Sequence, residues 1–207
     1  MNLYPNLLFH PNIPKPLHGM APRVYLGKDW WDKTKRTAKE KLNQHCWACG
    51  VHKSDAKYHG WLEAHECYSM DYALGRVEYV GTCALCHSCH NYIHDGRMQI
   101  LIDKDEFPLR KYLDILEHGN TILERFVKTQ GQEWLGGKNA FESELLFEKY
   151  PFFASFDKRL KWSRLGQGAE WEEYHMIING KKYLPIHRTF EDWKKFYSKK
   201  SEQPAFF

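Results

Sequence analysis

The sequence lacks any long hydrophobic run. No stretch of its 207 residues approaches the roughly 18 apolar residues that a membrane span requires. Its start, MNLYPNLLFHPNIPKP, has neither a basic n-region nor an uninterrupted apolar h-region. Internal repeats and low-complexity segments are also missing. These absences predict a soluble, cytoplasmic protein without a membrane partner, and 43% hydrophobic residues suffice for a packed core.

Excess charge is also scarce, since the net charge is only +4 and the pI is about 8.6. That total excludes no class of partner. Its distribution is uneven, because residues 1–60 carry ten Lys and Arg against four Asp and Glu, whereas residues 61–207 carry 20 against 22. The basic excess is densest in residues 28–41, KDWWDKTKRTAKEK. A solvated helix face is the simplest explanation of such a run.

Six cysteines are present, all within residues 45–96, and no export signal accompanies them, so metal ligation is favoured over disulfides. Cys46-Trp-Ala-Cys49 and Cys86-His-Ser-Cys89 are two CxxC pairs, each able to turn two thiolates toward one ion. Four thiolates close a tetrahedron, which is typical of structural zinc. A redox CxxC is disfavoured because one pair would suffice for it and no thioredoxin-like context is found.

Two cysteines remain outside these pairs. Cys83 extends the second pair to CxxCxxC and offers an alternative to Cys86 as a ligand. We expect Cys67 and Cys83 to be buried free thiols instead. Because 36 residues separate the two pairs, a small subdomain must lie between them.

The secondary-structure pattern predicts an α+β protein. Two short strands and a helix are expected between and after the CxxC pairs, and residues 98–102 are predicted as a third strand. A helix is expected to open at Pro108 and to be interrupted at Gly119. Asn179-Gly180 predicts a β-hairpin, because both positions of a type I′ turn need positive φ. Further helices are expected at about residues 29–43 and at residues 189–200, where an aromatic stripe is assigned to the core. Residues 140–160 are expected to form two helices joined by a turn.

Histidines gather near the second CxxC pair. His90 and His94 are spaced i, i+4 on a predicted helix, so both imidazoles fall on one face and can share a metal ion. His65 lies in the segment LEAHE between the pairs. We expect the remaining histidines of this region to be ordinary polar residues or outer-shell donors, namely His45, His52, His59 and His87.

The order C-x2-C, LEAHE and LC-x2-CH-N-x2-H resembles the HNH endonucleases of the ββα-metal class, over about residues 45–96. The front half of the chain is similar to uncharacterised HNH proteins of bacteria and their phages. The resemblance implies a four-cysteine structural Zn²⁺ and a catalytic Mg²⁺, Mn²⁺ or Zn²⁺. By register, His65 stands at the metal-ligand position, Glu66 stands at the position of the base histidine, and His90 with His94 resembles paired helix ligands.

Two role assignments stay open. Either His65 is the general base and Glu66 reaches the metal, or His65, His90 and His94 bind the metal and Glu66 is the base; register slightly favours the second. One departure from the family bears on activity, because Gly81 stands where many members have the middle asparagine.

Pattern and resemblance together predict three regions: a basic arm and helix (1–44), a zinc-braced HNH ββα-metal module (45–102), and a helical region with a hairpin near 171–184 (103–207). The implied function is a metal-dependent endonuclease or nickase acting on DNA in a bacterial cell, encoded by the bacterium or by a phage, with RNA as a second candidate substrate. The alternative is an inactive HNH-like module that binds DNA or a protein partner. Beside such a module the basic residues become candidate phosphate contacts, namely Lys33, Lys35, Arg36, Lys39, Lys41, Arg76 and Arg97.

Overall fold

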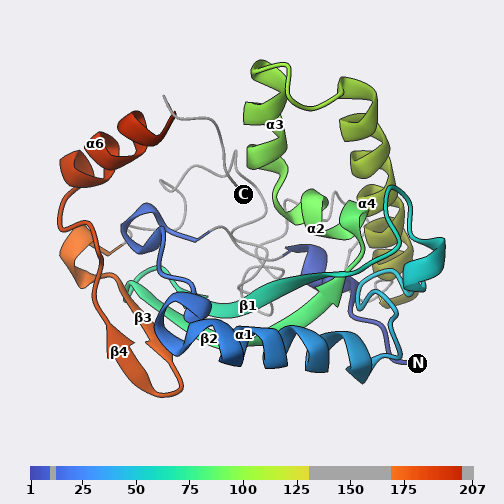
Figure 1. Cartoon of the computed structure of the whole chain (residues 1–207), viewed down its shortest axis with the longest axis horizontal. Coiled ribbons are helices and arrows are strands. Elements are labelled where there is room, and N and C mark those ends of the chain that lie inside the picture. Colours follow the sequence, from blue (N-terminus) through green and yellow to red (C-terminus); the bar gives the residue numbers. More distant parts are fainter. Residues whose placement is uncertain (10–12, 131–168, 202–207) are drawn as a thin grey trace.

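A computed structural model describes residues 1–9, 13–130 and 169–201. The chain is α+β, and Figure 1 shows a long β-hairpin with helices gathered at one end and a second hairpin at the other. In the described part the helices are α1 (Pro22–Lys41), α2 (His87–Ile93), α3 (Asp95–Asp103), α4 (Leu109–Gln130) and α6 (Phe190–Ser201). Short 3₁₀ turns are η1 (Pro5–Phe9), η2 (Lys15–Leu17), η3 (Lys53–Asp55) and η6 (Trp171–Glu173). No described helix is long and apolar enough to cross a membrane.

One four-stranded sheet has the order β1-β2-β3-β4, with β1 (Glu63–Asp71), β2 (Arg76–Leu85), β3 (His175–Ile178) and β4 (Lys181–Tyr183). β1 and β2 are antiparallel, β3 runs parallel to β2, and β4 is antiparallel to β3. The predicted hairpin is confirmed, since Asn179 and Gly180 have φ of 50° and 76° as a type I′ turn requires. Strand β3 pairs only with the start of β2, which leaves the rest of β2 alongside α1.

Helix α1 begins earlier than predicted. Pro22 stands in its first turn, where the missing N–H costs nothing. Gly27 interrupts the helix with a φ of 83°. The helix then packs along β2, so the basic run lies against the hairpin, as Figure 1 shows.

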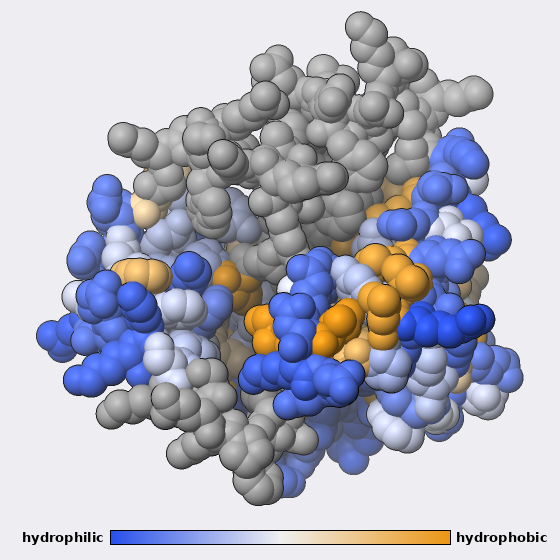
Figure 2. All heavy atoms as spheres, turned by 90° about the horizontal axis from the view of Figure 1, so that it is seen from above, coloured by the Kyte–Doolittle hydropathy of each residue, from blue (hydrophilic) through white to orange (hydrophobic). Residues whose placement is uncertain are grey.

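Two hydrophobic clusters divide the core. The first surrounds the four paired cysteines and includes Leu85, Met98 and Ile115, so it joins the hairpin to α2, α3 and α4. The second lies under the far end of the sheet and includes Tyr68, Val77 and Met176. On the face in Figure 2, hydrophobic side chains gather near the middle of the view, with hydrophilic ones on both flanks.

Two secondary-structure predictions and one burial prediction were wrong. Residues 98–102 belong to helix α3, and α4 runs through Gly119 without interruption. Gly119 is needed for close packing, because a β-carbon there would overlap the ring of Tyr92. The aromatic stripe of α6 is not all core, since Phe190 and Phe196 are 43% and 48% exposed. The two helices and turn predicted within residues 140–160 lie outside the described residues.

Candidate metal centre

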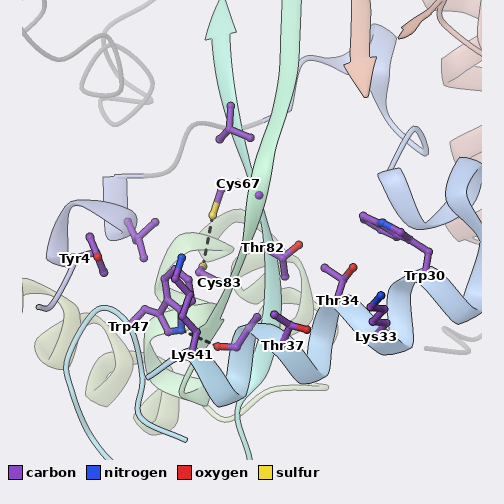
Figure 3. A pocket seen from close by; sticks show the side chains of 14 residues that line it. Tyr4, Trp30, Lys33, Thr34, Thr37, Lys41, Trp47, Cys67, Thr82 and Cys83 are labelled. Carbon is purple, nitrogen blue, oxygen red and sulfur yellow. Dashed lines mark hydrogen bonds between the residues drawn. The ribbon is translucent and has the colours of Figure 1, made fainter. Parts of the chain in front are cut away.

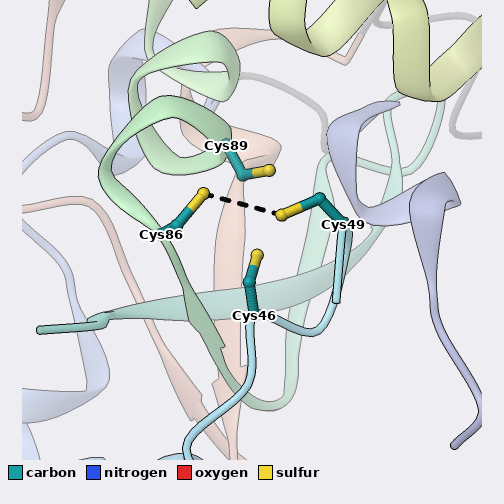
Figure 4. Close-up of side chains that lie close together, drawn as sticks. All are labelled: Cys46, Cys49, Cys86 and Cys89. Carbon is teal, nitrogen blue, oxygen red and sulfur yellow. Dashed lines mark hydrogen bonds between the residues drawn. The ribbon is translucent and has the colours of Figure 1, made fainter. Parts of the chain in front are cut away.

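The four cysteines of the two CxxC pairs come together, as the sequence predicts. Cys46 and Cys49 lie on a turn after α1, while Cys86 precedes α2 and Cys89 lies in its first turn (Figure 4). The Sγ atoms of Cys49 and Cys86 are 3.7 Å apart. Thiolates at about 2.3 Å from one tetrahedral ion would be about 3.8 Å apart, so the group fits zinc. These four cysteines could therefore hold a structural metal ion.

Hydrogen bonds among the four thiols shift their pKa values in opposite directions, raising those of Cys49 and Cys89 and lowering that of Cys46. Hydrogen bonds from Cys46, Cys49 and Cys89 hold the pKa of Cys86 well below its usual value. His118 of α4 adds an outer contact that sequence reasoning missed, with its Nε2 atom 3.4 Å from Cys89 Sγ. Nothing in the local sequence marks His118, because it lies 29 residues from Cys89 and reaches it only through the packing of α4 on α2.

Cys83 is not part of this group, so it does not replace Cys86 as a metal ligand. Its Sγ atom lies 3.5 Å from that of Cys67, on neighbouring strands. Cys83 is buried and Cys67 is partly buried, and both are free thiols, in line with the sequence prediction.

A second group consists of His65 on β1, His90 on α2 and His94 at the C-terminal cap of α2. The ring centres are 5.4 Å apart for His65 and His90, 5.1 Å for His65 and His94, and 4.7 Å for His90 and His94. An ion about 2.0–2.1 Å from one nitrogen of each ring, in tetrahedral geometry, puts the ring centres about 5 Å apart. The three imidazoles are therefore placed to share one cation.

Glu63 links this histidine group to two further histidines. Its Oε2 atom is in close contact with Nδ1 of His90, while its Oε1 atom lies 2.9 Å from His59 Nε2 and 2.8 Å from His87 Nδ1. Burial alone would raise the pKa of Glu63, but hydrogen bonds from His87, His90 and His59 hold that pKa well below its usual range. Glu63 is therefore a carboxylate at neutral pH. With Nδ1 of His90 engaged by Glu63, Nε2 is the nitrogen left for the histidine group.

Glu66 is not brought to the histidine group. Its carboxylate forms an ion pair with Arg23 of α1. Burial raises the pKa of Tyr68, a residue of the second core cluster, and the negative charge of Glu66 raises it further. Successive side chains of a strand point to opposite faces, so Glu66 faces away from His65. Both sequence assignments require Glu66 beside the metal, and the structure supports neither placement.

The predicted phosphate-contacting residues are scattered. Arg76 pairs with Glu78 at 2.6 Å and lies seven residues along β2 from Cys83, the cross-strand partner of His65. At about 3.3 Å per residue this separation is about 23 Å, so Arg76 is not beside the histidine group. Arg97 is closer along the chain, since its backbone N–H donates to the carbonyl of His94 at 2.9 Å.

On α1 the basic residues point in several directions. Lys33 and Lys41 line a cavity of about 510 Å³ between α1 and β2, together with Trp30 and Trp47 (Figure 3). Lys35 pairs with Asp32, and Arg36 is exposed. Burial lowers the pKa of Lys39, as it lowers the pKa of Lys111 on α4, and the negative charge of Glu63 opposes the shift in both residues. Lys111 was not predicted, and it belongs to a segment without excess charge.

Known proteins offer no further guide. The chain matches no family model, no curated protein and no solved structure.

Proposed function

We propose that the protein is a metal-dependent endonuclease or nickase of the HNH type that hydrolyses DNA phosphodiester bonds. The observation that carries the proposal is the histidine group of His65, His90 and His94. It lies where a β-hairpin meets the helix that follows it, beside four cysteines suited to structural zinc. This placement of strands, helix and ligands supports the ββα-metal arrangement that the sequence resemblance implies.

The three histidines would hold one Mg²⁺, Mn²⁺ or Zn²⁺. Such an ion would stabilise charge on a scissile phosphate and lower the pKa of a water molecule. Imidazole ligands suit zinc better than magnesium or manganese, so Zn²⁺ is the best match to this site among the three. Glu63 accepts a hydrogen bond from His90 and would keep the other ring nitrogen of His90 directed at the ion.

Glu63, and not Glu66, is the carboxylate that accompanies the histidine group. It lies on the same face of β1 as His65, two residues away, whereas Glu66 is paired with Arg23. The lowered pKa of Glu63 makes it a poor proton acceptor at neutral pH, so we assign it to orientation of His90 and not to general-base catalysis.

Positive charge near the site supports a phosphate-bearing substrate. Glu63 interacts electrostatically with Lys39 of α1 and Lys111 of α4, and Arg97 follows His94 by one turn of helix. Cations around a metal site attract the DNA backbone without reading its sequence. Single-stranded or folded RNA carries the same backbone charge and is the second substrate to be tested.

The alternative function is a zinc-braced module that binds DNA or a protein partner without turnover. The observation in its favour is the ion pair of Glu66 with Arg23, which withdraws the residue at the base position. Gly81, at the usual asparagine position, points the same way.

A plasmid assay separates the two functions. Supercoiled DNA is incubated with the protein and Mg²⁺, Mn²⁺ or Zn²⁺, and nicked product is measured. We expect nicking by the wild type, loss of at least 100-fold in His90→Gln and His94→Gln on the scale of removing a transition-state interaction, and no loss in the control His175→Gln on β3. DNA retention without nicking under every metal would establish the binding module instead. Undiminished nicking in both variants would place the chemistry elsewhere.

A further inference from the structure

We propose a third metal site, formed by His59, Glu63 and His87 and distinct from the cysteine and histidine groups. His59 lies in the loop before β1, Glu63 begins β1 and His87 begins α2. Each offers one ligand atom to a common centre. The site would take a borderline metal ion such as Zn²⁺ or Co²⁺, because two imidazoles and one carboxylate are its ligands.

The three donor atoms form a nearly regular triangle. Glu63 Oε1 is 2.9 Å from His59 Nε2 and 2.8 Å from His87 Nδ1, and the two nitrogens are 3.1 Å apart. Ligand atoms about 2.0–2.1 Å from one ion are separated by about 3.0–3.4 Å in octahedral or tetrahedral geometry. The triangle therefore needs little expansion to accept an ion.

Protons alone satisfy this triangle poorly. If His59 Nε2–H donates to His87 Nδ1, the lone pair of His87 faces the oxygen of Glu63 across 2.8 Å. If both nitrogens carry protons to donate to Glu63, two N–H groups face each other across 3.1 Å. One of the three contacts is unfavourable in either case. A divalent cation accepts a lone pair from all three atoms at once.

The surroundings allow an ion to enter and stay. The side chains of His59, Glu63 and His87 are 12%, 24% and 16% exposed, which leaves room for water ligands. The ring of Trp61 stacks on His59 at 3.7 Å and 3°, which fixes the His59 ring. The other oxygen of Glu63 contacts His90, so this single carboxylate would connect the third site to the histidine group.

This inference goes beyond the nuclease proposal, because binding of an ion here requires no reaction. The probe is Co²⁺, offered by equilibrium dialysis to the full chain after labile metals are removed under conditions that leave the cysteine-bound zinc. Metal content is then measured by mass spectrometry. We expect the wild type to hold two Co²⁺ per chain beside one Zn²⁺, and the control His175→Gln to match it.

Single and double variants assign the two cobalt ions. His59→Gln should hold one Co²⁺, His94→Gln should hold one, and the double variant should hold none. A wild type that holds one Co²⁺, lost in His94→Gln and kept in His59→Gln, would overturn the third site and leave the histidine group intact. His59 lies in a loop, so its replacement should leave zinc content and circular dichroism unchanged, which verifies folding. A cobalt content that His59→Gln does not alter would also refute the proposal.

Discussion

Replacing Cys89 with serine should remove the structural metal and unfold the module around it. Cys89 is fully buried in the larger core cluster, and it joins the start of α2 to the turn that carries Cys46 and Cys49. A serine hydroxyl stays protonated at neutral pH and is a poor zinc ligand, so the fourth corner of the tetrahedron would be lost.

The expected magnitude is large. Structural zinc contributes roughly 10–16 kcal/mol of apparent binding free energy in small zinc modules. The net stability of a domain is only about 5–15 kcal/mol. Loss of the ion therefore removes as much free energy as the whole fold retains. The same core cluster contains Leu85 and Ile115, so the packing of α4 on the hairpin should fail together with the metal site.

Cys67→Ser is the matched control. Cys67 lies on β1 in the same region, and it is outside the group of four. We expect one zinc per chain and cooperative thermal unfolding in the wild type and in Cys67→Ser, but neither in Cys89→Ser. Elemental analysis measures the zinc, and near-ultraviolet circular dichroism follows unfolding. A folded Cys89→Ser protein, or a metal-free wild type with an unchanged Tm, would refute the reasoning.

Three further predictions concern the histidine group, the core and the basic surface. Glu63→Gln should weaken metal binding by the histidine group about 10- to 100-fold, as measured by competition with a chelator, because outer-shell partners contribute on that scale; Glu66→Gln should change it little, and equal losses in the two variants would contradict the opposite facing of these carboxylates. Gly119→Ala should lower the free energy of unfolding by about 3 kcal/mol, since the added carbon meets the Tyr92 ring. Urea titration measures this loss, and Gly60→Ala, whose nearest new neighbour is 3.9 Å away, should be close to neutral. Charge reversal on α1 should reduce the slope of log DNA affinity against log salt by about 0.9 for each lost phosphate contact while zinc content stays intact; unchanged slopes would leave the helix as structure only, and the residues to reverse are Lys33, Lys39 and Lys41.

Local signals in the sequence were sufficient where one residue type decides the geometry. The CxxC pairs identified the four cysteines, and Asn179-Gly180 identified its turn, because each depends on short-range chemistry. Thr189 also marked the start of α6, where its Oγ1 atom accepts the N–H of Asp192 at 3.1 Å. These elements need no knowledge of the rest of the chain.

Other elements depended on contacts far along the chain. The run MQILI fits a strand or a helix equally well by composition, and packing after α2 made it helical. Gly119 resembles a helix breaker, yet Tyr92 requires its small size. His118, His59 and His87 gain their meaning only from distant partners, namely Cys89 for the first and Glu63 for the other two.

The placement of the carboxylates follows from the length of β1. Register with the HNH family treats His65 and Glu66 as neighbours at a strand end, where the chain turns and both side chains can approach one ion. Here both lie inside a nine-residue strand, paired with Cys83 and Thr82, and the bulge comes only after Cys67. Within a regular strand, faces alternate with a period of two. The carboxylate that accompanies His65 must then be two residues away, and Glu63 occupies that position.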